Sequence, residues 1–167
     1  MSRLERDEIR RRLEEARDFD EVFRLVKRVV RERMGMNRAG LMLALADIPS
    51  EVLAYHVVGT NLIVINRILY EQVRSQSRDR TLVNSYLFVV LLHEYLHSLG
   101  VTDEIRVRAL TARLTQDSLG SDHLAYTLSS KPIQTVLPQL LNVRPMTSSD
   151  RVELVKEFDR ESVTYIF

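Results

Sequence analysis

The first forty residues have the hydrophobic spacing of two amphipathic helices. Ser2 and Glu5 stand at the spacing of a capping box, which predicts a solvated helix over residues 3–17. A second helix is predicted over residues 19–34. Its apolar side chains recur at intervals of three and four positions: Val22, Phe23, Val26, Val29, Val30 and Met34.

The pattern then changes to short apolar runs. Residues 41–46, 52–58 and 62–65 are rich in β-forming side chains, and Gly59 lies in a hairpin-like connection between the last two runs. Because the runs are short and close together, residues 41–66 are predicted to form a small, largely antiparallel sheet.

Helical spacing returns in the second half of the chain. The long apolar stretch at residues 81–99 ends at Gly100, a typical residue after a helix C-terminus. Residues 130–149 contain three prolines and are expected to be irregular, and residues 162–167 have a β-like composition. The other predicted helices cover residues 67–74, 102–114, 122–128 and 150–157.

These elements predict a single α+β domain over residues 1–167. In this arrangement the N-terminal helices of residues 1–40 pack on the sheet of residues 41–66. The helix of residues 81–100 is buried against the other side. The mainly helical part, residues 101–167, completes the domain.

Composition narrows the possible chemistry. The chain has no cysteine, which excludes a disulfide scaffold, a zinc ribbon, an iron–sulfur cluster and a thiol nucleophile. With 24 basic and 23 acidic side chains, the chain lacks the strong positive charge that drives non-specific nucleic-acid binding. No signal peptide and no apolar run long enough to span a bilayer is present, so we expect a cytoplasmic protein without a membrane partner.

One segment has the spacing of a catalytic metal site. His93, Glu94 and His97 form the pattern H-E-x-x-H within the long predicted helix. A helix turns about 100° per residue, so the two histidines lie on one face, one turn apart, and their Nε2 atoms can reach one ion. Glu94 lies beside the first ligand, where it can act as a general base without binding the metal.

A third ligand is expected after the turn at Gly100. Asp103 is the favoured candidate, because the turn can direct its carboxylate back towards the histidines. The alternatives are Glu104, His123 and Glu153. Three protein ligands leave one position open for water, which is the pattern of a catalytic zinc ion, so one zinc per chain is expected.

The segment HEYLHSLGVTD at residues 93–103 resembles the H-E-x-x-H-x-x-G-x-x-H/D signature of the metzincin clan of zinc peptidases. This resemblance implies a zincin-like fold of the small single-domain prokaryotic type. It also implies zinc bound by His93, His97 and Asp103, with Glu94 as general base and a peptide or protein as substrate. Metzincins have a methionine-containing turn beneath the metal, for which Met146 is the candidate.

The spacing is also similar to H-x-x-x-H-x-x-G-x-x-H in the bacterial endoribonucleases of ribosomal RNA maturation. Those enzymes usually have histidine where this chain has Asp103, and their motif lies near the C-terminus, whereas more than sixty residues follow it here. These differences, together with Glu94, favour the peptidase. A metal-dependent endoribonuclease and a non-catalytic metal-binding module are the two alternatives. His56, in the second predicted strand, is expected to have a structural role or to line the cleft.

Overall fold

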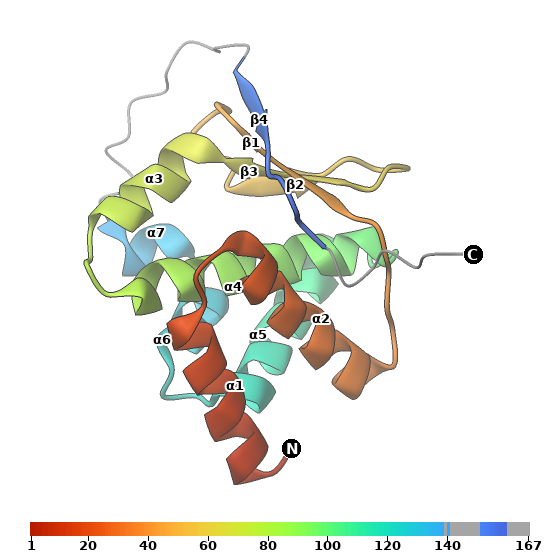
Figure 1. Cartoon of the computed structure of the whole chain (residues 1–167), viewed down its shortest axis with the longest axis vertical. Helices are drawn as coiled ribbons and strands as arrows, with labels where there is room; N and C mark the ends of the chain where they lie inside the picture. Colours follow the sequence, from red (N-terminus) through yellow and green to blue (C-terminus); the bar gives the residue numbers. More distant parts are fainter. Residues whose placement is uncertain (139, 141–150, 160–167) are drawn as a thin grey trace.

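The computed structural model describes residues 1–138, 140 and 151–159, which form an α+β fold as the hydrophobic pattern predicts (Figure 1). The predicted tail at residues 162–167 lies outside these residues. In chain order the elements are α1 (Arg3–Glu15), α2 (Phe19–Met34), β1 (Met42–Ala46), β2 (Ala54–His56), β3 (Leu62–Asn66), α3 (Arg67–Ser75), α4 (Arg80–Ser98), α5 (Glu104–Leu119), α6 (Leu124–Ser130), α7 (Ile133–Val136) and β4 (Val152–Leu154).

The first two helices begin at the predicted caps. The Glu5 N–H donates to Ser2 Oγ at 3.2 Å, and the Ser2 N–H donates to the Glu5 carboxylate at 2.7 Å. The Glu21 N–H donates to Asp18 Oδ1 at 2.8 Å at the start of α2. These bonds satisfy N–H groups that have no partner within the helix. α1 ends before the predicted residue 17, because the backbone is no longer helical at Ala16.

The sheet has the strand order β2-β3-β1-β4. β3 lies between β2 and β1, antiparallel to β2 and parallel to β1, and β4 is antiparallel to β1. Two of the three pairings are therefore antiparallel, but the central pairing is parallel. The parallel pair arises because the chain leaves β1, crosses to the far edge, and returns through the β2–β3 hairpin to the place beside β1.

The prediction of a helix over residues 150–157 is wrong. Val152–Leu154 form β4 along the edge of β1. The segment is held by Asp159, whose carboxylate accepts hydrogen bonds from Lys27 Nζ at 2.8 Å and from the Leu41 N–H at 2.9 Å. The buried pair and the strand pairing are long-range contacts, which local helical periodicity does not report.

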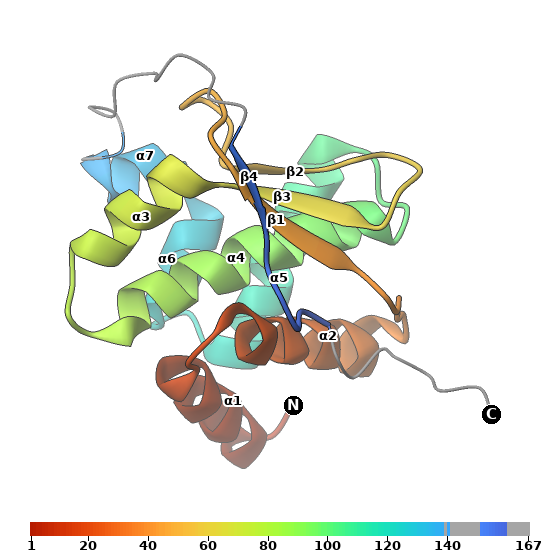
Figure 2. The same cartoon turned by 45° about the horizontal axis from the view of Figure 1, so that its top comes forward.

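α4 lies between the sheet and helices α1, α2 and α5 (Figures 1 and 2). The predicted placement of the N-terminal helices on one side of the sheet and of this helix on the other is therefore wrong: α1 and α2 pack mainly on α4. α4 contacts five other helices and β2. Its middle is apolar and buried on all sides, with the buried side chains of Tyr86, Leu87, Phe88, Val89, Val90, Leu91 and Leu92. Such a helix provides a rigid support for the residues at its C-terminal end. Among the described residues, no helix is long and apolar enough to cross a membrane.

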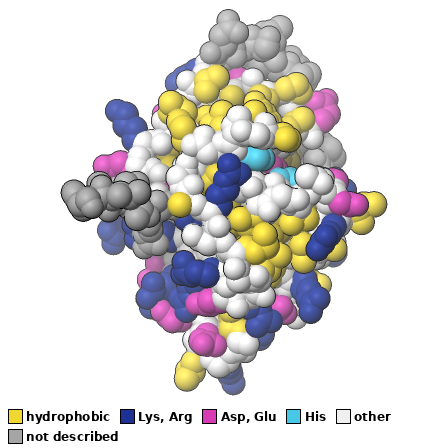
Figure 3. All heavy atoms as spheres, turned by 90° about the vertical axis from the view of Figure 1, so that its right-hand side faces the viewer, with side chains coloured by type: hydrophobic (Ala, Val, Ile, Leu, Met, Phe, Trp, Pro, Cys, Tyr) yellow, Lys and Arg dark blue, Asp and Glu magenta, His cyan; other side chains and the backbone are white. Residues whose placement is uncertain are grey.

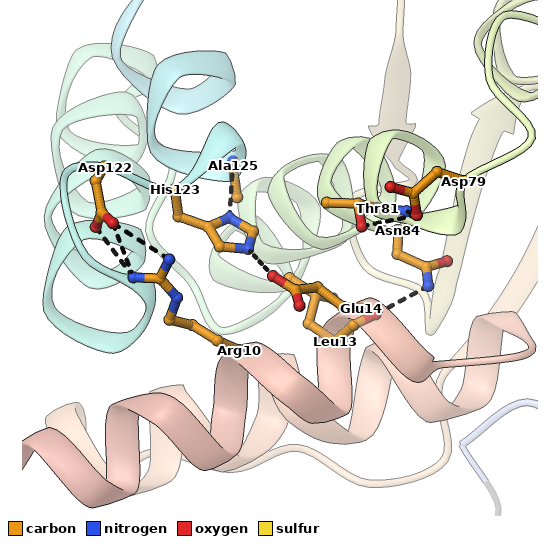
Figure 4. Close-up of polar contacts among 9 residues, drawn as sticks. All are labelled: Arg10, Leu13, Glu14, Asp79, Thr81, Asn84, Asp122, His123 and Ala125. Atoms are coloured by element: carbon orange, nitrogen blue, oxygen red, sulfur yellow. Dashed lines mark hydrogen bonds and ion pairs between the residues drawn. The ribbon is translucent and has the colours of Figure 1, made fainter.

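A polar cluster joins α1 to the start of α6 (Figure 4). Arg10 forms a two-pronged ion pair with Asp122, with its closest contact at 3.0 Å. The buried His123 ring lies between the two helices: its Nδ1 accepts the Ala125 N–H at 3.1 Å, and its Nε2 lies 3.3 Å from a carboxylate oxygen of Glu14. The cluster fixes α6, whose far end lines the cavity described below.

Candidate metal centre

The two motif histidines lie on one face of the last turns of α4, as the spacing predicts. Their ring centroids are 5.0 Å apart. Each side chain is about one-fifth exposed, so both rings are reachable from solvent while the helix beneath them is buried. The spacing of the motif and the burial of α4 therefore place two imidazoles side by side at the surface.

The carboxylate that reaches these histidines is that of Glu104. Its Oε1 lies 2.9 Å from His93 Nε2, and its Oε2 lies 2.9 Å from His97 Nε2. One ligand atom from each of the three residues can be chosen so that all lie within 4.8 Å of one another. The three side chains could therefore hold one metal ion. They come from the end of α4 and the first turn of α5.

Asp103, the favoured third ligand from sequence, has a different position. It is the N-cap of α5, and its Oδ1 accepts the Arg106 N–H at 3.0 Å. The turn at Gly100, with φ of +98°, directs the chain back towards α4 as expected. The cap fixes the Asp103 side chain on the backbone of its own helix, so the next residue, Glu104, faces the histidines. An aspartate before a predicted helix is a typical N-cap, and this signal in the sequence favours Glu104.

The other candidate ligands lie elsewhere. His123 is buried between α1 and α6. Glu153 is on β4, at the opposite edge of the sheet from β2, the strand that contacts α4. Neither belongs to the group formed by His93, His97 and Glu104. Met146 lies outside the described residues.

The hydrogen bond of His97 Nδ1 determines whether Nε2 of the same ring can donate or accept. Nδ1 lies 2.8 Å from the Val101 carbonyl oxygen. A carbonyl only accepts hydrogen bonds, so Nδ1 carries the proton, and Nε2 of the neutral ring presents a lone pair to the Glu104 carboxylate. Two acceptors then face each other at 2.9 Å. This contact is favourable only when the ring is protonated or when a cation binds both groups.

The group is electrostatically poised for a cation. Burial lowers the pKa of His93, which favours the neutral ring that a metal requires. Burial acts to raise the pKa of the Glu104 carboxyl, but the two histidines and Arg108 outweigh it and lower the pKa overall. At neutral pH the group therefore offers an anionic carboxylate beside a neutral imidazole of His93.

Glu94 lies beside the group but outside it. The residue is 6% exposed, and burial raises the pKa of its carboxyl to about 7. The His97 imidazole and a hydrogen bond from the His56 backbone N–H act in the opposite direction. A carboxyl that titrates near neutral pH can accept a proton and return it in one reaction cycle, as a general base requires.

A cavity of about 690 Å³ opens beside these residues. His93, Glu94 and Glu104 line one part of it. Its other walls are the segment before and at the start of β2, the middle of α4, the first half of α5, and the α6–α7 region. Figure 3 shows histidine side chains at the surface with hydrophobic side chains on either side. The cavity-lining residues from α6, from α7 and from the link between them, which includes Lys131, belong to no motif. They could not be recognised from the sequence.

β2 is an edge strand of the sheet, and its first residue, Ala54, lines the cavity. The Asn66 N–H donates to the Leu53 carbonyl, and the Val57 N–H donates to the Leu62 carbonyl. Because antiparallel pairing alternates, the backbone groups of Ala54 and His56 point away from β3. The His56 N–H bonds to Glu94, so the groups left for another chain are the N–H and carbonyl of Ala54 and the carbonyl of His56. This edge could pair with another extended chain.

Comparisons with protein-family models, with curated proteins and with solved structures find no match to this chain. Its function must therefore be argued from the site.

Proposed function

We propose that this protein is a zinc-dependent metallopeptidase, in which His93, His97 and Glu104 hold the metal and Glu94 is the general base. The observation that carries the proposal is the convergence of two Nε2 atoms and a carboxylate beside a buried glutamate. Glu104 replaces Asp103 as the third ligand of the site predicted from the motif, and the proposed roles of His93, His97 and Glu94 are unchanged.

The donor set fits zinc. Two imidazole nitrogens and one carboxylate oxygen are a common set of protein ligands for catalytic zinc. Imidazole donors disfavour calcium and magnesium, which prefer oxygen ligands. The bond from His97 Nδ1 to the Val101 carbonyl is the outer contact that usually orients a metal-binding histidine. When bound, zinc would supply a Lewis acid that activates water near neutral pH and polarises the scissile carbonyl.

Glu94 handles the proton in this proposal. It accepts a proton from the attacking water and passes it to the amine that leaves when the peptide bond breaks. Its burial excludes bulk water and places its pKa near 7, which suits both steps.

The edge of β2 supports an extended peptide as the substrate. Ala54 directs its N–H and carbonyl away from β3, towards a chain that would add to the sheet. The cavity between α4 and α6–α7 could then take a side chain of that peptide, because much of its lining is apolar: Val52, Leu53, Val89, Val90, Leu128, Pro132 and Ile133.

The test is metal content followed by cleavage of a peptide library. Protein purified without added metal is expected to contain about one zinc per chain and to cleave peptides. Glu94→Gln should keep the zinc and lose about 10²–10⁴-fold in kcat, the range for loss of a positioned acid–base group. Glu51→Gln, which changes another glutamate lining the cavity, is the matched control and should stay active.

Three results would overturn the proposal. One is a Glu94→Gln variant that cleaves as fast as the wild type. The other is a zinc-loaded wild type that cleaves structured RNA and no peptide, which would favour the endoribonuclease. Zinc bound without either activity would point to the non-catalytic module.

A further inference from the structure

Arg38 connects three parts of the molecule around the candidate site. It lies in the loop between α2 and β1, and its backbone N–H donates to the Tyr95 hydroxyl at 2.9 Å. Its guanidinium donates to the Ser98 carbonyl at 2.6 Å and to the Thr60 carbonyl at 2.9 Å. Ser98 directly follows His97, and Thr60 lies in the hairpin between β2 and β3.

The Thr60 carbonyl also receives a second side chain. His56 Nε2, from β2 itself, lies 2.8 Å from it. The hairpin is further held by Thr60 Oγ1, which donates to the Val57 carbonyl at 2.7 Å and accepts the Leu62 N–H at 3.1 Å. The hairpin is thus internally fixed, and Arg38 joins its turn to the end of α4. The hydrogen bond from the His56 N–H to Glu94 is a second link, between the end of β2 and α4.

The two elements joined in this way are the two sides of the candidate site. α4 carries the histidines and Glu94, and β2 carries the free backbone edge above them. Arg38 is half-buried and makes two charge-assisted hydrogen bonds to carbonyls that the regular structure leaves unpaired. Its planar guanidinium binds the two carbonyls through two different nitrogens, Nη1 and Nη2, whereas a lysine has a single nitrogen to reach both.

We propose that Arg38 is a positioning residue that fixes the β2 edge relative to the histidine end of α4 and so sets the pose of the bound peptide. This inference rests on the proposed peptidase function. The Arg38 guanidinium does not contact His93, His97 or Glu104, so its removal should leave metal binding intact and change how the substrate is held. A displacement of about 1 Å at a reacting centre can cost about 100-fold in rate.

The experiment compares Arg38→Gln with Arg67→Gln. Arg67 is the matched control because it also makes two hydrogen bonds, to Asp47 at 2.7 and 3.0 Å, at the opposite end of β3 from Thr60. Arg38→Gln is expected to keep about one zinc per chain, to lower kcat/KM by roughly 10- to 100-fold with a raised KM, and to speed amide exchange in residues 57–62. Arg38→Lys should recover little. Arg67→Gln should show neither the kinetic nor the exchange effect at the hairpin.

Unchanged kcat/KM in Arg38→Gln would overturn the inference, as would an equal loss in Arg67→Gln or a loss of zinc. Amide exchange separates the inference from the proposed function. If the wild type cleaves no peptide, the proposed function fails, but amide exchange still tests whether Arg38 fixes the hairpin. Unchanged protection of residues 57–62 in Arg38→Gln would refute that role, and a selective loss of protection there would support it.

Discussion

Two histidine–carboxylate contacts in this protein look alike and differ in what they can do. In the candidate metal centre, His97 Nε2 lies 2.9 Å from Glu104. Between α1 and α6, His123 Nε2 lies 3.3 Å from Glu14 (Figure 4). The distinction comes from the other nitrogen of each ring.

His97 Nδ1 faces a carbonyl and must carry the proton, whereas His123 Nδ1 accepts the Ala125 N–H and must not. Neutral His123 therefore carries its proton on Nε2, the nitrogen that lies 3.3 Å from Glu14, so this contact needs no metal. The neutral ring of His97 directs a lone pair at Glu104, so this contact is favourable only with a proton on Nε2 or with a cation between the two groups. The second nitrogen, not the distance to a carboxylate, separates a candidate metal ligand from a structural histidine.

The largest effect is expected from exchanging the two histidines in turn for alanine. His97→Ala should lose the zinc and lower turnover by at least the 10²–10⁴-fold expected for Glu94→Gln, because both the metal and its chemistry are lost. His123→Ala should retain about one zinc per chain. Metal analysis and peptide cleavage check both variants, and loss of zinc from His123→Ala alone would reverse the assignment.

Glu104 and Asp103 give the next contrast. Glu104→Gln should weaken zinc binding by at least about 100-fold, since even loss of an outer contact to a ligand costs about 10- to 100-fold. Asp103→Asn should bind zinc like the wild type, because asparagine is also a good N-cap. A competition titration with a coloured chelator measures both affinities. The opposite order would restore Asp103 as the third ligand.

His123 should matter for stability and its pH dependence. His123→Ala leaves a small cavity and removes a buried hydrogen-bond acceptor, which should lower the free energy of unfolding by about 1–3 kcal/mol. Burial is the main cause that lowers the pKa of His123 in the folded state; Arg10 acts in the same direction, and Glu14 and Asp122 oppose it.

As the pH falls, His123 therefore becomes protonated at a higher pH in the unfolded chain than in the folded chain. The stability from this residue is full above about pH 6.5, the pKa of unfolded histidine, and declines as the pH falls towards the folded pKa. Urea unfolding between pH 5 and pH 8 should show a steeper decline in the wild type than in His123→Ala. Parallel pH curves would contradict the assigned environment.

The smallest effect is expected at the helix cap. Asp103→Ala should cost about 1 kcal/mol of unfolding free energy through loss of the bond to the Arg106 N–H. Its zinc affinity should fall only as far as the first turn of α5, which carries Glu104, becomes frayed. A loss of zinc as large as that in Glu104→Gln would indicate that Asp103 binds the metal directly.

Features that depend on local spacing could be predicted from the sequence, and features that depend on distant contacts could not. The helix α4 and the common face of His93 and His97 depend on local spacing and on a strongly apolar run, and the structure confirms both predictions. The metal itself stays a prediction. The choice between Asp103 and Glu104 depends on which side chain the cap uses, and two adjacent carboxylates after one turn leave that open until the helix start is known. β4 could not be predicted because Val152–Leu154 become a strand through β1 and the Lys27–Asp159 pair, which are distant in sequence. Arg38 likewise acts on residues far along the chain.

The most direct test is diffraction from crystals grown with zinc, with data collected on both sides of the zinc absorption edge. One anomalous zinc peak is expected, about 2 Å from His93 Nε2, His97 Nε2 and a Glu104 carboxylate oxygen. No peak is expected at His123. A peak bound to Asp103 would refute the assigned ligand set. The absence of any peak between the two histidines of α4 would contradict the metal centre itself.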